Sequence, residues 1–244
     1  MLDIYNKKKL KKIFKKKILL GHKSSNRNPK MSKYILLKYN NIDILNPFKV
    51  INKLKKAELI LKKCAYIGGI ILFVGTKKQI SYLIEKYAKK VNMPFINYKW
   101  PAGLLTNIKV TRLSIKKKLK IEKNKKNIYK FLSKKEKNII ERKYKKICIK
   151  FGSIENMNRL PLFIIIVDVK KEYIVVNEAK KTSIYTIGIV DTDSSPDNID
   201  YIIPANDDSS KSIKYILNKL TNSIIEGLNK REKKKKLSEK IRKK

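Results

Sequence analysis

Residues 70–78 read Ile-Ile-Leu-Phe-Val-Gly-Thr-Lys-Lys, an apolar run that stops at a glycine and is followed by polar residues. Five successive apolar residues have the length of a buried strand, and the pattern that follows predicts a helix to about residue 90. Similar short runs predict strands at residues 95–98, 162–167, 184–190 and 201–203, with helices at about 171–181 and 210–228. Strands that alternate with helices predict an α/β fold, a doubly wound parallel sheet.

The N-terminal part of the chain adds smaller elements to this sheet. Residues 1–17 are rich in lysine and their apolar residues fall at helical spacing, which predicts a short basic amphipathic helix; a solvated charged arm is the alternative. Pro29 and Pro47 bracket two apolar runs at residues 34–37 and 42–45, which predict a hairpin. A further helix is predicted to begin at Pro47 and to run to about residue 66.

Residues 108–150 do not fit the alternation, because they contain no strand-like run and neither glycine nor proline. Apolar residues among the lysines predict an α-helical hairpin, a coiled-coil arm, with a turn and cap at residues 124–127 or at Ser133. A disordered insertion is the alternative. The predicted organisation is a basic helix or arm at 1–20, a sheet domain formed by 21–107 and 151–228, the inserted hairpin at 108–150, and a mobile basic tail at 229–244.

The charge of the chain indicates a polyanionic partner. Lys and Arg number 61 against 20 Asp and Glu in 244 residues, a formal net charge of +41. A folded domain with this charge repels itself unless a polyanion neutralises it, so nucleic acid is the predicted partner, with a membrane surface or an acidic protein as the alternatives. No apolar run approaches the roughly 20 residues that cross a bilayer, so no membrane span is predicted.

The sequence has no pattern of catalytic residues, and we predict neither enzyme activity nor a small-molecule substrate. Gly75 and Thr76 follow a predicted strand, but the GxxxxGK[ST] spacing of a phosphate loop is absent. We expect Thr76 to cap the following helix, and Lys77 and Lys78 to face an RNA backbone. One histidine and two cysteines do not suffice for a histidine triad, a disulfide framework or a four-thiolate zinc site.

Acidic residues follow three of the predicted strands: Asp168, Asp191, and the pair Asp207 and Asp208. Carboxyl ends of parallel strands share one edge of a sheet, so these side chains are expected there, as helix caps or as a binding site. No cofactor is predicted except a weak candidate zinc ion, for which His22, Asp191 and Asp208 would supply one nitrogen and two oxygens, and water the fourth ligand. The alternative is that His22 contacts RNA or a backbone carbonyl.

Two segments, residues 21–31 and 99–107, combine basic residues with glycine, proline and asparagine, and the second also contains Trp100. This composition suits contacts to phosphate and ribose. Trp100 is expected either to stack on a base or to pack at a domain seam. The predicted RNA-binding residues are His22, Lys23, Arg27, Asn28, Lys30, Lys77, Lys78, Lys99, Trp100, Thr106, Asn107, Lys109 and Arg112.

Five short motifs follow one another along the chain. They are Gly-His-x₄-Arg-Asn-Pro-Lys-Met at 21–31, Ile-Leu-Phe-Val-Gly-Thr-Lys-Lys at 71–78, Lys-Trp-Pro-Ala-Gly-x-Leu-Thr-Asn at 99–107, Gly-x-Ile-x-x-Met-x-x-Leu-Pro at 152–161 and Ile-Pro-Ala-Asn-Asp-Asp at 203–208. In this order and spacing, with Glu178-Ala179 and Val190–Thr192 between the last two, they resemble the small-subunit ribosomal protein two family of bacteria and organelles. The resemblance runs from about residue 19 to 227. It departs from the family pattern at Arg27, where the family has tryptophan, at Pro101-Ala102, where it has Leu-Gly, and at Phe151, where it has glycine.

The resemblance implies a flavodoxin-like α/β domain with an inserted helical hairpin. It also implies a structural role in the small ribosomal subunit near the head–body junction, with small-subunit rRNA and neighbouring ribosomal proteins as partners and translation as the process supported. A non-ribosomal organelle nucleic-acid-binding protein is the alternative function.

The compartment is also predicted from the resemblance and the composition. Ala205 resembles plastid members of the family, and the abundance of Lys, Ile and Asn, whose codons are AT-rich, indicates an AT-rich genome. Together with the lack of a transit peptide, these features predict an organelle ribosome in a relict plastid. A mitochondrion and the cytoplasm of an AT-rich endosymbiont are the alternatives.

Overall fold

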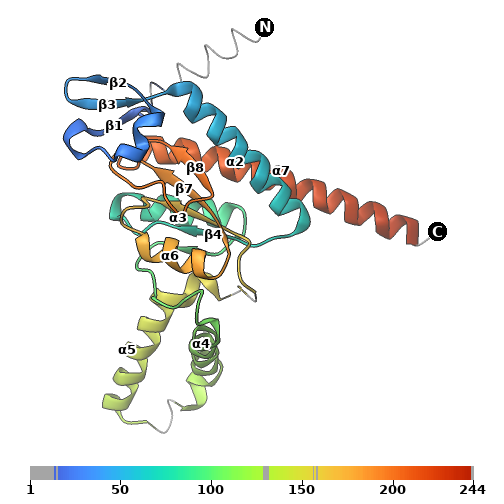
Figure 1. Cartoon of the computed structure of the whole chain (residues 1–244). Coiled ribbons are helices and arrows are strands. Elements are labelled where there is room, and N and C mark those ends of the chain that lie inside the picture. The colour runs from blue at the N-terminus through green and yellow to red at the C-terminus, as the bar shows by residue number, and fades with distance from the viewer. Residues whose placement is uncertain (1–13, 15, 129–131, 156, 158, 243–244) are drawn as a thin grey trace.

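A five-stranded parallel sheet forms the centre of the protein (Figure 1). The computed structural model describes residues 14, 16–128, 132–155, 157 and 159–242. The strands lie in the order β5-β4-β6-β7-β8, and every neighbouring pair is parallel. Their bounds are β4 Ile71–Val74, β5 Phe95–Ile96, β6 Phe163–Val167, β7 Tyr185–Val190 and β8 Tyr201–Pro204. The parallel α/β sheet predicted from the apolar runs is therefore confirmed.

Helices cover both faces of this sheet. All four residues of β4 and the last four of β6 are buried, and successive residues of a strand point to opposite faces, so both faces are shielded from water. Helix α7 (Ser210–Arg242) packs on α2 (Pro47–Ile67) and on α3 (Lys78–Lys90), and α6 (Tyr173–Lys181) contacts β7. Among the residues described, no helix combines the length and the apolar character that crossing a membrane requires.

A small antiparallel sheet lies beside the large one, in the order β1-β3-β2. Its hairpin, β2 (Ile35–Tyr39) and β3 (Ile42–Leu45), is the predicted one. Asn40 and Asn41 both have positive φ, as a tight two-residue hairpin turn requires. Strand β1 (Leu20–Lys23) was not predicted, because its four residues have no apolar alternation and gain their order from residues distant in the chain, above all by pairing with β3.

Two helices occupy the segment 108–150: α4 (Ile108–Ile128) and α5 (Lys134–Phe151). They contact each other and extend away from the sheet (Figure 1). Ser133, one of the two predicted caps, begins α5 in a capping box with Glu136. Ile115 and Lys118 of α4 are buried, whereas no residue of α5 is. The division into an inserted arm and a sheet domain stays a prediction.

The chain termini differ from expectation at one end. The last helix was predicted to end near residue 228, but α7 continues to Arg242. The segment after Gly227 contains neither glycine nor proline and is rich in lysine, a strong helix former, so nothing in it ends the helix. The predicted basic N-terminal helix covers residues 1–17, and of these residues 1–13 and 15 lie outside the described part of the chain.

Candidate functional site

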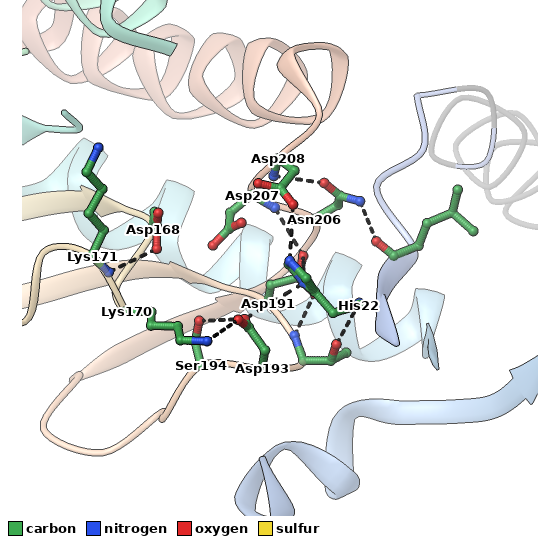
Figure 2. A network of polar contacts seen from close by, with 12 residues as sticks. His22, Asp168, Lys170, Lys171, Asp191, Asp193, Ser194, Asn206, Asp207 and Asp208 are labelled. Carbon is green, nitrogen blue, oxygen red and sulfur yellow. Dashed lines mark hydrogen bonds and ion pairs between the residues drawn. The ribbon is translucent and has the colours of Figure 1, made fainter. Parts of the chain in front are cut away.

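Five aspartates gather at the carboxyl edge of the parallel sheet (Figure 2). Asp168 follows β6, Asp191 and Asp193 follow β7, and Asp207 and Asp208 follow β8. The chain has nine aspartates in total, so more than half of them lie at this edge of a strongly basic protein. The prediction that Asp168, Asp191, Asp207 and Asp208 share one edge is confirmed by the strand order. We call these five residues, with His22, Lys77 and Lys170, the edge cluster.

His22 reaches the edge cluster because the N-terminal strand β1 is hydrogen-bonded to the strand ends. Its backbone N–H donates to Oγ1 of Thr192 at 2.9 Å, and the N–H of Asn28 donates to the carbonyl of Thr192 at 2.8 Å. A Cβ atom at Gly21 would overlap the Thr192 side chain, so only glycine allows this close approach.

The imidazole of His22 is enclosed by carboxylates. Nδ1 lies 3.2 Å from Oδ2 of Asp191, which is completely buried, and 3.8 Å from Asp193; Nε2 lies 3.1 Å from Oδ2 of Asp208. These neighbours, Asp191 first, raise the pKa of His22 to about 9 although burial opposes them. In the absence of another cation the ring is therefore protonated at neutral pH.

Lys77 provides a second positive charge in the edge cluster. Its Nζ lies 2.8 Å from Asp168, 3.1 Å from Asp207 and 2.9 Å from Asp208. Lys170 pairs with Asp193 at 2.8 Å. Burial raises the pKa of Asp207 to about 7, with the neighbouring carboxylates adding to the effect. Five carboxylates thus face two lysines and one histidine.

The loop after β4 differs from the prediction. Thr76 does not cap α3; its backbone N–H and its hydroxyl both donate to Glu172, at 3.0 and 2.5 Å. Glu172 is buried, and burial raises the pKa of its carboxyl group. Its hydrogen bonds with Thr76 fix the loop, so Thr76 is bound to Glu172 and does not serve as the cap of α3. Lys77, predicted to face RNA, has its ammonium group among the aspartates, while Lys78 is exposed at the start of α3.

In the segment 21–31, some of the predicted RNA contacts are engaged inside the protein. Arg27 donates from Nε to Asp43 at 2.7 Å, and Asp43 is completely buried. Asn28 accepts a hydrogen bond from the backbone of Lys30, whose ammonium group pairs with Asp197. Lys23 is exposed.

In the segment 99–107, Trp100 is 7% exposed and packs inside the protein. Its Nε1 donates to Glu178 at 3.1 Å, and the same carboxylate accepts from the N–H groups of Gly103 and Leu105 at 2.7 and 3.1 Å. Of the two alternatives for this tryptophan, the structure favours packing over base stacking. The other predicted RNA-binding residues of this region are exposed: Lys99, Thr106, Asn107, Lys109 and Arg112.

A basic groove along α2 was not singled out from the sequence. It has a volume of about 580 Å³, and two lysines lie over the ring of Tyr34, with Nζ of Lys33 at 5.3 Å and Nζ of Lys53 at 5.9 Å from its centroid. We call it the α2 groove. Its basic and aromatic residues are Lys33, Tyr34, Lys49, Lys53, Lys55 and Lys56. The lysines at 49, 53 and 56 recur at helical spacing, a signal that the lysine-rich background of the sequence concealed.

Comparison with known proteins identifies relatives over nearly the whole chain. A family model described as ribosomal protein S2 matches residues 13–227. The chain is 50% identical over 206 residues to the small ribosomal subunit protein uS2 of Karelsulcia muelleri (strain GWSS), an alignment covering 84% of this chain and 93% of the relative. It is 42% identical over 227 residues to the uS2 protein of Flavobacterium johnsoniae, covering 93% of this chain and 89% of that protein.

Proposed function

This chain belongs to the ribosomal protein S2 family, and on that premise we propose that it is a structural constituent of the small ribosomal subunit that supports translation. The observation that carries the proposal is the match of one family model to residues 13–227, together with relatives named small ribosomal subunit protein uS2. The role is architectural. The titratable groups of the edge cluster are paired with one another, which supports a scaffold over a catalyst.

The partner that suits the surface is small-subunit rRNA. The net charge of +41 favours a polyanion as partner, and several acids, among them Asp43 and Asp168, are buried in ion pairs while most of the described lysines are exposed. Two exposed regions have the residue types that bind phosphate and ribose: the segment from Lys99 to Arg112, and the α2 groove. We further propose contacts to neighbouring ribosomal proteins and a position near the head–body junction, both of which follow from the family resemblance.

The compartment is proposed from the relatives. Both relatives named above are bacterial, and the composition indicates an AT-rich genome. These observations support the cytoplasm of an AT-rich endosymbiont over the plastid that Ala205 suggested. A plastid or mitochondrial ribosome stays as the alternative.

Sedimentation through a sucrose gradient tests the ribosomal role. The tagged chain is expressed in a bacterium whose own uS2 is depleted, and its position in the gradient is measured at low and moderate salt. We expect one copy of the chain to sediment with each small subunit and to be displaced by the Flavobacterium relative. A chain that stays at the top of the gradient would instead support the non-ribosomal nucleic-acid-binding alternative.

The control distinguishes incorporation of the folded chain into the small subunit from non-specific attraction between its lysines and rRNA. Ile165 is completely buried in the central strand β6, so Ile165→Asp disrupts the fold and leaves the net charge almost unchanged. If this variant sedimented with small subunits as well as the parent chain does, the association would be electrostatic only.

A further inference from the structure

Helix α7 projects from the fold beyond the C-terminal end of α2 (Figure 1). The family model matches the chain only to residue 227, so family membership does not account for the last turns of this helix. We call residues 229–239 the α7 extension. It contains six Lys and Arg against two Glu, and all of its residues are exposed except Arg231, which is half-buried. The α7 extension is therefore an exposed helix with a high density of positive charge.

Three basic side chains gather where the α7 extension passes the C-terminal end of α2. Nη2 of Arg159 donates to the carbonyl of Gly68 at 2.5 Å. A Cβ atom at Gly68 would overlap the guanidinium of Arg231, so this group lies directly on the glycine. Nζ of Lys234 lies 5.6 Å from the centroid of the exposed ring of Tyr66. Cations held close together repel one another, and two guanidinium groups form a favourable site for a phosphate.

The basic residues of the α7 extension lie on two opposite faces. With 3.6 residues per turn, successive side chains of a helix are about 100° apart. Arg231, Lys234 and Lys235 therefore share the face that meets the end of α2, which we call the inner face. Lys233 and Lys236 share the opposite one, the outer face. A polyanion on one side of the helix would leave the charge on the other side uncompensated.

The residue types of the α7 extension favour RNA over a membrane or a protein as its partner. A helix that lies on a membrane buries an apolar face, and the core of a protein interface is depleted of lysine. Leu237 is the one large apolar residue among residues 229–239, and it is 61% exposed. Lysine and arginine side chains bind the phosphates of a nucleic acid, and RNA strands can approach a projecting helix from both sides.

We propose that the α7 extension lies between two segments of rRNA, binding the phosphates of one on its outer face and the phosphates of the other on its inner face together with Arg159. The inference rests on the proposed ribosomal function. It adds an RNA-binding element outside the family match to the segment from Lys99 to Arg112 and the α2 groove. Because the helix holds its two faces apart, the α7 extension would fix the two rRNA segments relative to each other.

Two double variants with equal loss of charge test the two faces separately. Lys233→Gln with Lys236→Gln changes the outer face, and Lys234→Gln with Lys235→Gln changes the inner face. Glutamine has nearly the helix propensity of lysine, so the helix is kept. The affinity of each full-length chain for purified small-subunit rRNA is measured over a range of salt concentrations. Both variants should reduce the slope of log K against log salt by about two.

Lys211→Gln with Lys214→Gln is the matched control. These two lysines are exposed on the same helix with the same spacing as Lys233 and Lys236, but they lie outside the regions proposed to bind RNA, so the slope should not change. A reduced slope for only one face would overturn the placement between two rRNA segments. An unchanged slope for both faces, or an equal reduction in the control, would overturn RNA binding by the α7 extension. Circular dichroism verifies that each variant folds.

Directed hydroxyl-radical cleavage identifies the partner in the assembled subunit. Leu237→Cys attaches an iron chelate to the α7 extension without removing a charge, and Cys148→Ser removes the half-buried thiol. Cys64 is kept, because burial raises the pKa of its thiol to about 11 and disfavours the reactive thiolate. We expect cleavage of rRNA at two separate segments.

Sedimentation of the same chain keeps this inference distinct from the proposed function. If the chain sediments with the small subunit but the chelate cleaves fewer than two rRNA segments, the inference is overturned and the proposed function stands. A chain that does not sediment with the subunit counts against the proposed function, and the salt slopes with purified rRNA then decide on the α7 extension alone.

Discussion

At the scale of single residues, the buried acids are each held by a specific donor. Asp43 is completely buried in β3, where Arg27 donates to both of its oxygens, from Nε to Oδ2 at 2.7 Å and from Nη2 to Oδ1, and Ser24 also donates to Oδ1, at 2.6 Å. Arg27 stands where the family pattern has tryptophan, so this chain neutralises the carboxylate with a guanidinium. The buried ion pair fixes the loop between β1 and the hairpin, because breaking it would leave a charge in a dry environment.

We predict that this pair makes stability fall in acid. The hydrogen bond from Arg27 lowers the pKa of Asp43 below its unfolded value. The pair therefore contributes its full stability above the unfolded pKa, near 4, and loses it as the pH falls through the folded pKa. Urea unfolding at several pH values should show a shallower loss in acid for Asp43→Asn than for the parent. An equal slope in both proteins would contradict the role of Asp43.

At neutral pH, Arg27→Ala should lower the free energy of unfolding by about 1–3 kcal/mol, because Ser24 alone cannot satisfy the buried carboxylate. Lys30→Ala is the comparison. It removes an exposed pair with Asp197, and such pairs contribute about 0–1 kcal/mol.

We predict that Trp100 contributes to stability and not to RNA affinity. Trp100→Leu removes the donor to Glu178 and part of a buried ring, so unfolding should become easier by about 2–4 kcal/mol. RNA binding by the folded variant, measured below its unfolding temperature, should stay unchanged. Lys99→Ala, at the exposed neighbour, should weaken RNA binding with little effect on stability. Base stacking would give the reverse result, since each stacked base contributes about 1–3 kcal/mol.

At the scale of secondary-structure elements, the packing of α2 against α7 depends on one glycine. A Cβ at Gly227 would overlap the carbonyl oxygen of Lys62 and lie 2.8 Å from Cβ of Ala65. Glycine in the middle of a helix normally destabilises it by about 1 kcal/mol relative to alanine. Here the close approach of the two helices reverses that preference, because the backbone of α2 cannot move away without disturbing its contact with β8.

We predict opposite effects for the same substitution at two glycines. Gly227→Ala should destabilise the protein by about 1–3 kcal/mol, because overpacking outweighs helix propensity. Gly152→Ala should stabilise it by about 0.4–1 kcal/mol, since Gly152 is in helical conformation and a Cβ there meets no atom within 4 Å. Thermal unfolding of the two variants tests both the loss of stability predicted for Gly227→Ala and the gain predicted for Gly152→Ala. A stabilised Gly227→Ala variant would show that α2 and α7 adjust freely.

The elements themselves were largely predictable, because their signals are local. The apolar run at 70–74 and the cap at Ser133 each act on their own neighbours in the chain. Strand β1 was missed because its order comes from pairing with β3, and the continuation of α7 because a charge run was interpreted as a tail.

At the edge cluster, parallel topology was enough to bring Asp191 and Asp208 to one edge of the sheet, whereas His22 reaches them through the hydrogen bonds that His22 and Asn28 make with Thr192. The contacts of Lys77 were not predictable, since they depend on the conformation that its long, flexible side chain adopts. The pairing of Trp100 with Glu178 was missed for another reason: it joins residues 78 positions apart.

At the scale of the whole molecule, positive and negative charges are separated. Asp43 and three acids at the sheet edge, Asp168, Asp191 and Asp207, are buried and pair with a few basic residues, whereas most of the described lysines are exposed. A lysine in an internal pair has already lost its counterions, so it contributes little to RNA binding. A lysine on the surface releases a counterion when it meets a phosphate, and each such contact steepens the dependence of affinity on salt.

We therefore predict that the salt dependence of rRNA binding depends on the surface lysines and not on lysines in internal ion pairs. The slope of log K against log salt should be about −0.9 per phosphate for duplex RNA or about −0.7 for single strands. If the α2 groove contacts RNA, replacing Lys53 and Lys56 together by alanine should reduce the slope by about two. Lys77→Met should leave the slope unchanged and lower stability, because Lys77 pairs with Asp168, Asp207 and Asp208. A slope near zero for the parent chain, or an equal slope in all three proteins, would contradict this separation of roles.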